Sequence, residues 1–401
     1  MAAFSIEARD GATRARAGTL HTAHGDVRTP AFVPLATNAT VKGLLAAEVS
    51  ALGYEMVLGN TFHLLLKPGH ELIARRGGLH RFMGWPGPII TDSGGFQVFS
   101  MGHGTVADEI KGRRRSHGGE SAGAILAIAE EGVTFRSYVD GAVRHLSPEV
   151  AMEVQAALGS DVALAFDECT PFHVDRDYTA RSTERTHRWL ERCLAWHAEH
   201  GPAAQLVYGI VQGGVHEDLR RASAQTVRDS ASDGVAIGGS LGADKPQMYE
   251  VVGWATAELG GTAENLPRHL LGIGEVDDLI RCVELGIDTF DCAMPTRLGR
   301  HGTALVADPA ARWRMDLLKS RWGESDEPLM ADCPCEACAG GLSRSYLSYL
   351  ARAGEMTGMR LLTLHNLSFL SRLMGDVRRA IASGSLAATA AALRAGASPG
   401  A

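Results

Sequence analysis

The feature that most constrains the fold of this chain is a repeated alternation of short β-rich runs with longer amphipathic stretches. The alternation begins at residue 31 and is typical of strands that are joined by crossover helices. Eight such units predict an α/β fold of the (β/α)8 barrel class, the TIM barrel. The expected strands are AFVPLA (31–36), YEMVLG (54–59), PIIT (88–91), VALAFD (162–167), QLVYGIV (205–211), VAIG (235–238), RHLLG (268–272) and IDTFD (287–291).

Polar residues and glycines stand at the carboxyl ends of these runs. Because the carboxyl ends of the strands form the active-site face of a (β/α)8 barrel, these residues should converge on one site. An open doubly wound sheet is the alternative, but its G-x-G-x-x-G fingerprint is absent after the first run. The residues are Asn60, Asp92, Asp167, Gln212, Gly238 with Gly239, Gly272 with Gly274, and Asp291.

Three of the seven cysteines fall within six residues, as Cys333, Cys335 and Cys338. An odd cysteine count without regular spacing argues against a secreted disulfide framework. Together with His365, the cluster offers three thiolates and one imidazole, the ligand set of a closed tetrahedral zinc site. Four protein ligands leave no place for a catalytic water, so we expect one structural Zn²⁺. Buried free thiols are the alternative.

Two segments interrupt the alternation of strands and helices. Residues 101–131 are rich in glycine and charge, include the basic run KGRRR (111–115), and are longer than a compact barrel needs. The small, weakly amphipathic residues at the end of the chain predict a final helix that frays. We therefore expect a catalytic barrel over residues 1–322, a zinc-binding subdomain with closing helices over 323–383, and a flexible tail over 384–401.

Composition narrows the class of protein. With 401 residues, 45% of them hydrophobic, the chain can bury a large core. No run approaches the roughly 20 apolar residues of a membrane helix, and the first residues lack the apolar core of a signal peptide. We expect a cytoplasmic protein without a membrane partner. The net charge of −7 means that any RNA contact must use a local basic patch.

Two aspartates, Asp92 in ITDSGGFQVFS and Asp291 in IDTFDCAMPTR, end separate expected strands. Two carboxylates around one pocket can support displacement at a sugar anomeric carbon, one as the nucleophile and one for proton transfer. Either aspartate alone would be interpreted more simply as the cap of a following turn. A third carboxylate, Asp167 in AFDECTP, ends the fourth expected strand.

The surrounding residues indicate a pocket for a flat base. The segment 93–96 (SGGF) lets the backbone approach a ligand closely, and Phe96 offers a stacking face, although it could equally be a core residue. Gln212 and the amides of Gly238 and Gly239 can donate to a carbonyl, while Asp167 can accept from an amidine-like edge. Together these groups complement guanine.

Eight motifs occur in order along the chain and closely resemble those of bacterial-type queuosine tRNA-guanine transglycosylases, or queuine tRNA-ribosyltransferases. The resemblance extends from about residue 5 to residue 383, and the number of ordered motifs makes it highly specific. The motifs are TDSGGFQVFS, GSDVALAFDECTP, GIVQGG, VAIGG, LLGIGEVDDL, GIDTFDCAMPTRLGRHG, CPCEAC and TLHNL.

The resemblance implies a pentosyltransferase of queuosine biosynthesis, which exchanges guanine at the wobble position of GUN-anticodon tRNAs for 7-aminomethyl-7-deazaguanine or queuine. It implies Asp291 as the nucleophile of a covalent ribosyl-enzyme intermediate and Asp92 as the general acid/base. It also implies a homodimer. The base-binding residues would be Ser93, Gly94, Gly95, Phe96, Asp167, Gln212 and Gly239. The tRNA-binding residues would be Gly272, Ile273, Gly274, Glu275, Val276, Asp277, Asp278, Thr296, Arg297, Leu298, Gly299 and Arg300.

Local charge favours an RNA contact near the last expected strand, because residues 291–321 carry six arginines and lysines against three aspartates.

Two positions point to different incoming bases. Cys169 resembles members that use the aminomethyl precursor, whereas Gly242 resembles members that accept queuine. Two rival functions are an archaeosine-type enzyme, expected to carry a further RNA-binding domain, and a non-catalytic partner, expected to lack one of the two catalytic carboxylates.

Overall fold

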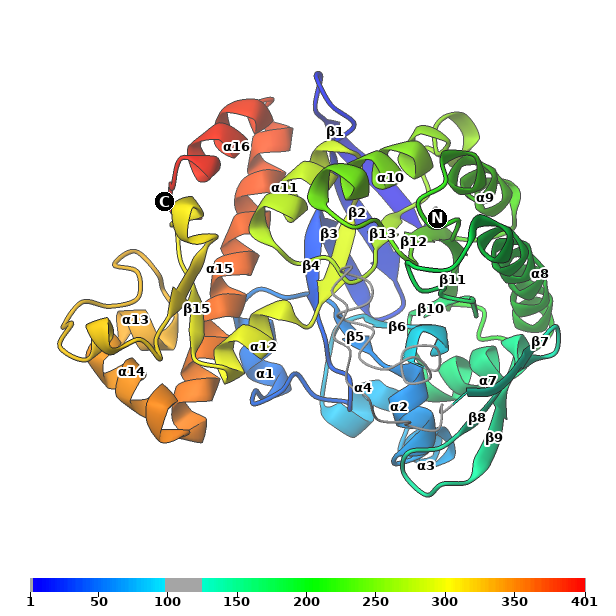
Figure 1. Ribbon diagram of the computed structural model, residues 1–401, viewed down its shortest axis with the longest axis horizontal. Coiled ribbons are helices and arrows are strands. Elements are labelled where there is room, and N and C mark those ends of the chain that lie inside the picture. Colours follow the sequence, from blue (N-terminus) through cyan, green and yellow to red (C-terminus); the bar gives the residue numbers. More distant parts are fainter. Residues whose placement is uncertain (1–2, 98–124, 401) are drawn as a thin grey trace.

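The computed structural model describes residues 3–97 and 125–400 of the chain, and its centre is a closed parallel barrel (Figure 1). Eight parallel strands form one sheet in the order β4-β14-β13-β12-β11-β10-β6-β5. A parallel bridge between Leu35 and Leu58 joins the two edge strands and closes the sheet. The predicted (β/α)8 barrel is confirmed. The strands are β4 (Ala31–Pro34), β5 (Val57–Gly59), β6 (Ile89–Thr91), β10 (Val162–Leu164), β11 (Leu206–Val211), β12 (Gly234–Ile237), β13 (Arg268–Leu270) and β14 (Thr289–Cys292).

Helices surround the barrel, so both faces of its strands are buried. Strands that are buried on both faces consist mainly of consecutive apolar residues. In α7 the Ser147 hydroxyl accepts a hydrogen bond from Val150 N–H (3.3 Å) at the start of the helix, and Gly159 ends the helix with a φ of 71°. In the described residues no helix has both the length and the apolarity to cross a membrane. The helices up to β14 are α1 (Ala46–Ala51), α2 (Thr61–Leu66), α3 (His70–Arg75), α4 (Gly78–Met83), α7 (Pro148–Leu158), α8 (Arg176–His200), α9 (Glu217–Asp229), α10 (Lys245–Ala257) and α11 (Val276–Glu284).

An antiparallel sheet that the sequence analysis did not predict closes the amino-terminal end of the barrel. It consists of β1 (Phe4–Arg9), β2 (Arg16–Thr22) and β3 (Gly25–Thr29). Its buried Arg16 donates to both carboxylate oxygens of Asp288 (2.8 and 2.6 Å), which precedes β14. Three of its apolar side chains pack among those inside the barrel: Phe4, Leu20 and Val27. We call this sheet the barrel floor.

Two further parts of the chain extend the barrel. A small antiparallel sheet of β7 (Ile125–Ala129), β8 (Gly132–Arg136) and β9 (Val143–Leu146) precedes α7. Residues 101–124 of the predicted loop, with the KGRRR run, lie outside the described residues. After β14 come α12 (Met294–Arg300), a hairpin of β15 (Thr303–Leu305) and β16 (Arg314–Asp316), and the helices α13 (Glu336–Ala339), α14 (Arg344–Ala353), α15 (Met356–Ala382) and α16 (Leu386–Arg394). Helix α15 contacts β4 and takes the eighth helix position, with α13 and α14 on its outer side (Figure 1).

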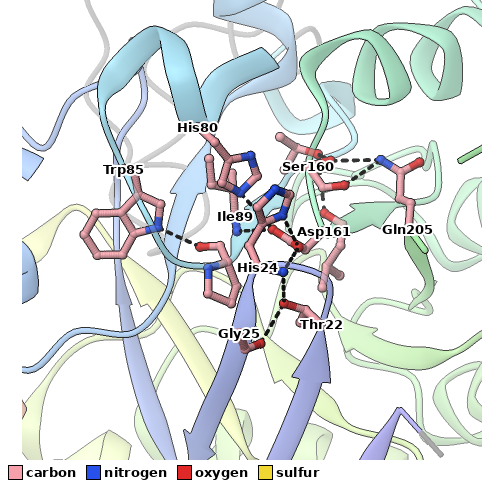
Figure 2. Close-up of polar contacts among 12 residues, drawn as sticks. Thr22, His24, Gly25, His80, Trp85, Ile89, Ser160, Asp161 and Gln205 are labelled. Atoms are coloured by element: carbon pink, nitrogen blue, oxygen red, sulfur yellow. Dashed lines mark hydrogen bonds and ion pairs between the residues drawn. The ribbon is translucent and has the colours of Figure 1, made fainter. Parts of the chain in front are cut away.

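Asp161, directly before β10, joins the floor to the barrel wall (Figure 2). Its Oδ1 accepts hydrogen bonds from the backbone N–H (3.2 Å) and Nδ1 (2.8 Å) of His24, in the turn between β2 and β3. Its Oδ2 accepts from Ile89 N–H (2.8 Å) and His80 Nε2 (3.0 Å). Burial opposes ionisation, but the N–H groups of His80 and Ile89 outweigh it and hold the pKa of Asp161 below its usual value.

Two imidazoles and a carboxylate are also a ligand set that transition metals use. Here, however, the rings of His24 and His80 are stacked, with centroids 3.6 Å apart and planes inclined by 18°. An imidazole nitrogen binds a metal through a lone pair that lies in the plane of its ring. One ion bound by both rings would have to lie in both ring planes, which two nearly parallel planes at this separation do not allow. The three side chains therefore form a hydrogen-bonded clamp between floor and wall.

We expect Asp161→Asn to lower the free energy of unfolding by about 2–4 kcal/mol at pH 7, because the new amide N–H groups would face two buried donors. The folded-state pKa of Asp161 lies below the unfolded value of about 3.9. The stabilisation should therefore be present above that pH and be lost as the pH falls through the folded pKa. Urea unfolding at several pH values measures the effect. Asp26→Asn alters only an exposed pair with His21 and is the control; equal losses in both variants would contradict the clamp.

Candidate active site and metal centre

Asp92 lies at the carboxyl end of β6 and is held by groups that follow β5. Its Oδ1 accepts a hydrogen bond from the backbone N–H of Thr61 (2.8 Å), and its Oδ2 accepts from Gln97 Nε2 (3.0 Å) and from the amide of Asn60. Asn60 also caps α2 by accepting from His63 N–H (2.9 Å). Asn60 is thus the cap of α2, whereas the carboxylate of Asp92, which could have been a simple cap, accepts from groups beyond a neighbouring strand.

Burial raises the pKa of Asp92 to about 7. The N–H of Thr61 lowers it and the negative charge of Asp291 raises it, which places the two aspartates within electrostatic reach of each other. A carboxyl group that titrates near neutral pH can both give and take a proton under ordinary conditions. Asp92 is therefore equipped for proton transfer.

Asp167 lies beyond the end of β10 and contacts two other predicted base-binding residues. Its Oδ1 accepts from the hydroxyl of Ser93 (2.6 Å), and its Oδ2 accepts from Gln212 Nε2 (2.6 Å). Burial raises the pKa of Asp167 to about 6, although the hydrogen bonds from Ser93 and Gln212 lower it. A Cβ at Gly95 would lie 2.4 Å from the Asp167 carbonyl oxygen, so only glycine fits there.

Gln212 carries a buried polar atom without a partner. Its Oε1 accepts no hydrogen bond from any of the described residues. The same oxygen would lie 2.1 Å from a Cβ at Gly239, where φ is +73° and a side chain would be strained in any case. An unsatisfied buried acceptor carries a free-energy cost of about 1–3 kcal/mol, which a donor on a bound ligand would offset. Phe96, which is 40% exposed, is not a core residue.

Arg220 supports this region and was not predicted from the sequence. Fully buried on α9, it donates to the carbonyls of Gly214 (2.7 Å), Gly238 (2.8 Å) and Ser240 (2.8 Å). It thereby ties the loop after β11 to the loop after β12. A sequence signal exists, because Arg220, Ser223, Ala224 and Val227 share one face at helical spacing.

Asp291 lies in β14, next to β13, and is 7% exposed. Its Oδ1 accepts hydrogen bonds from His269 Nε2 (3.1 Å) and from the backbone N–H of Gly272 (3.1 Å). Gly272 is the first residue of a predicted tRNA-binding segment, so that segment begins at the candidate nucleophile. His269 was not singled out from the sequence, although it and Arg268 are polar side chains in an expected strand.

The two predicted tRNA-binding segments flank Asp291. Gly272, Ile273 and Gly274 follow β13, and Glu275 to Asp278 form the beginning of α11. The acidic side chains of this segment have partners within the protein: Glu275 pairs with Arg314, Asp277 accepts from Trp313 Nε1 (3.2 Å), and Asp278 pairs with Lys245 (2.8 Å). The second segment forms most of α12, with Thr296 and Gly299 buried, Leu298 and Arg300 half-buried and Arg297 exposed.

The four predicted zinc ligands lie together in a buried site. The Sγ atoms of Cys333, Cys335 and Cys338 lie 3.6, 3.3 and 3.4 Å from Nδ1 of His365. In a tetrahedral zinc site, sulfur and nitrogen ligands are about 3.5 Å apart. His365 Nε2 donates to the carbonyl of Leu305 (2.8 Å), which leaves Nδ1 to bind the metal. The donor set and its geometry fit one structural Zn²⁺.

Helix α15 connects this metal site to α12. His365 faces the three cysteines, and the next residue, Asn366, is fully buried. The Asn366 amide donates to the carbonyls of Pro295 and Thr303 (both 3.0 Å) and its oxygen accepts from Leu305 N–H (2.6 Å). The position of α12 beside Asp291 therefore depends on a helix that the metal fixes.

We expect Cys335→Ala to lose the single zinc ion per chain and to unfold at a lower temperature, because structural zinc contributes directly to folding. Hydrogen exchange should also become faster over residues 294–300 as α15 loosens. Elemental analysis and exchange mass spectrometry measure both effects. Cys282→Ala, in α11, removes a buried thiol away from the site and should keep its zinc; full zinc content in Cys335→Ala would refute the ligand set.

The chain matches known proteins over nearly its whole length. A family model described as "Queuine tRNA-ribosyltransferase" matches residues 10–397. A protein with the same name from Roseiflexus sp. is 50% identical over 394 residues, which cover 96% of this chain and 97% of the relative. Relatives of that name from Pelotomaculum thermopropionicum and Deinococcus radiodurans are 45% and 44% identical, over 95% and 94% of this chain and 95% and 88% of their own lengths. The resemblance carried by the motifs is confirmed, and the chain belongs to the queuine tRNA-ribosyltransferase family.

Proposed function

We propose that this protein exchanges guanine at the wobble position of GUN-anticodon tRNAs for a 7-substituted 7-deazaguanine, through a covalent ribosyl-enzyme intermediate in queuosine biosynthesis. The observation that carries the proposal is the pair of carboxyl groups at one barrel end, the half-buried Asp92 with its pKa raised to about 7 and the buried Asp291 close enough to raise it. Net retention at an anomeric carbon needs one carboxylate to attack and another carboxyl group to move protons.

In the proposed first step, the carboxylate of Asp291 attacks C1′ of the ribose and the bond between C1′ and N9 of guanine breaks. The electron pair stays with the departing base, which takes a proton from the acid form of Asp92. The new base then enters, and the carboxylate of Asp92 removes the proton from its N9. That nitrogen attacks C1′ and releases Asp291, so two inversions give net retention.

We propose that Asp167 and Gln212 bind the guanine-like edge of the base. In the ligand-free protein Gln212 Nε2 donates to Asp167, so the two side chains satisfy each other until a base enters between them. The base then donates to Asp167 and accepts from Gln212 and the Gly239 N–H. The exposed ring of Phe96 supports a flat ligand at this place.

The tRNA is proposed to lie across α12 and the loop after β13. Burial lowers the pKa of Arg300, and so does the charge of its neighbour Arg297, which indicates a local excess of positive charge. A phosphate group would neutralise that excess. The acids of the segment Gly272–Asp278 already have internal partners, so its backbone rather than its charge would contact RNA. A tRNA substrate also puts the proposed reaction in the cytoplasm.

The proposed second protein partner is another copy of this chain, as in the homodimer that the family resemblance implies. Large apolar side chains are exposed together on α14 and at the start of α15, where Tyr346, Tyr349 and Met356 are 44%, 60% and 82% exposed. Exposed apolar side chains that gather in one region are typical of interaction surfaces. The separation into a barrel over 1–322, a zinc-binding subdomain over 323–383 and a tail remains part of this proposal.

For the incoming base we propose the aminomethyl precursor ahead of queuine. Gly242 has a φ of +117°, and a Cβ there would lie 2.8 Å from Cγ of Gln247. The backbone alone therefore requires glycine at this position, so Gly242 says little about the size of the base. Cys169, which is buried near Asp167, is therefore the more informative of the two positions about the incoming base.

We expect the wild-type protein to release labelled guanine from the wobble position of a GUN-anticodon tRNA when 7-aminomethyl-7-deazaguanine or queuine is supplied separately. Asp291→Asn should form no denaturation-resistant adduct with tRNA, because an amide is a poor nucleophile. Gel electrophoresis under denaturing conditions measures the adduct, and Asp26→Asn at the opposite barrel end is the matched control. Failure to release guanine with either base would refute the function; an adduct that persists in Asp291→Asn would refute the nucleophile.

We expect kcat/KM for tRNA to fall as the pH rises through about 7, because the first step needs the acid form of Asp92. Asp291→Asn removes a nearby negative charge and should lower the pKa of Asp92. The pKa of Asp167, which is raised by burial and by Glu168, should stay in place and is the internal control. Carbon-13 NMR titration of the aspartate carboxyl groups measures both values. An unchanged pKa of Asp92 would show that the two carboxyl groups do not form a pair.

A further inference from the structure

We infer that His269 is a positioning residue for the nucleophile, and that it directs Oδ2 of Asp291, rather than Oδ1, at the ribose. The inference rests on the proposed role of Asp291 and adds a residue that neither the motifs nor the family comparisons assign. It begins from the position of a single histidine inside the barrel wall.

The sheet geometry puts His269 against Asp291. Strands β13 and β14 are parallel neighbours, and His269 is directly paired with Thr289. Residues two apart on a strand share a face, so Asp291 lies diagonally next to His269 on the same side as Thr289. The imidazole is fully buried, with Nδ1 at 2.9 Å from the Thr289 hydroxyl and Nε2 at 3.1 Å from Asp291 Oδ1.

These two contacts define the position of the ring proton. A carboxylate oxygen can only accept a hydrogen bond, so His269 Nε2 must carry the hydrogen that it shares with Asp291. The Thr289 hydroxyl can donate to Nδ1, so both ring nitrogens have a partner when the shared hydrogen is on Nε2. Hydrogen bonds thus connect Thr289 to His269 and His269 to Asp291, the candidate nucleophile.

The two oxygens of Asp291 are consequently unequal. Oδ1 accepts from His269 Nε2 and from Gly272 N–H, whereas Oδ2 accepts no hydrogen bond from any residue in the described part of the chain. The unpaired oxygen keeps its lone pairs for attack on C1′. In the covalent intermediate Oδ2 is bonded to C1′ and Oδ1 is the carbonyl oxygen. When the incoming N9 attacks C1′, the electron pair of the C1′–Oδ2 bond returns to the carboxylate, where both N–H donors stabilise the charge.

The test compares two replacements of His269. His269→Gln can place an amide N–H near the position of Nε2, while His269→Phe fills the space without a donor. We expect His269→Phe to lower kcat by about 10–100-fold and to slow both formation and breakdown of the adduct, with little change in KM for tRNA. His269→Gln should recover most of the rate. A purely structural role would affect both variants alike and would lower the melting temperature in parallel with activity.

Several outcomes would overturn the inference. One is exchange at the wild-type rate in a folded His269→Phe variant, and another is no recovery in His269→Gln. If neither variant folds, nitrogen-15 NMR of the wild-type histidines still decides, because an Nδ1–H tautomer at His269 is incompatible with donation from Nε2. A wild-type protein without any exchange activity would instead refute the proposed function itself, so the two failures can be told apart.

Discussion

The bridge between Leu35 and Leu58 turns an open sheet into a barrel, and the rest of the molecule depends on that closure. Once the eight parallel strands form a ring, their carboxyl ends must face a common space. Asp92, Asp167 and Asp291 come from strands that are far apart in the chain, yet contacts or charge link each of them to this end of the barrel. Local sequence determines which side chain ends each strand, and closure determines that these side chains meet.

The two ends of the barrel treat buried carboxylates in opposite ways. On the floor side, Asp161 has four donors and Asp288 accepts from two nitrogens of the buried Arg16 guanidinium, so the charge of each carboxylate is compensated and holds elements together. At the other end, the donors to Asp92 and Asp167 do not outweigh burial, and both pKa values are raised. The same residue type therefore holds elements together at one end, and at the other it has the raised pKa that suits the proton transfer and base recognition we propose.

The alternating pattern predicted the barrel well because its strands are buried on both faces and most of them consist mainly of apolar residues. The cysteine cluster predicted the metal site because few other structures need three thiols so close together. The floor sheet was missed although β1 alternates between more buried and exposed side chains, because it precedes residue 31, where the repeated strand-helix pattern that predicted the barrel begins. Arg220 was missed although helical spacing puts it on the buried face of α9, and His269 was missed because its contact with Asp291 depends on strand register, which no local pattern encodes. The roles of the site residues remain predictions.

The floor has one more consequence, which concerns how the protein can be handled. Strand β1 begins at Phe4, and the turn that carries His24 lies beside Asp161, at the strand ends remote from Asp92 and Asp291. A solid support or a fluorescent dye attached here would leave the opposite mouth of the barrel open to a ligand as large as tRNA. The exposed Ala23, beside His24 but outside the clamp, is thus a natural point for immobilising this protein in binding measurements.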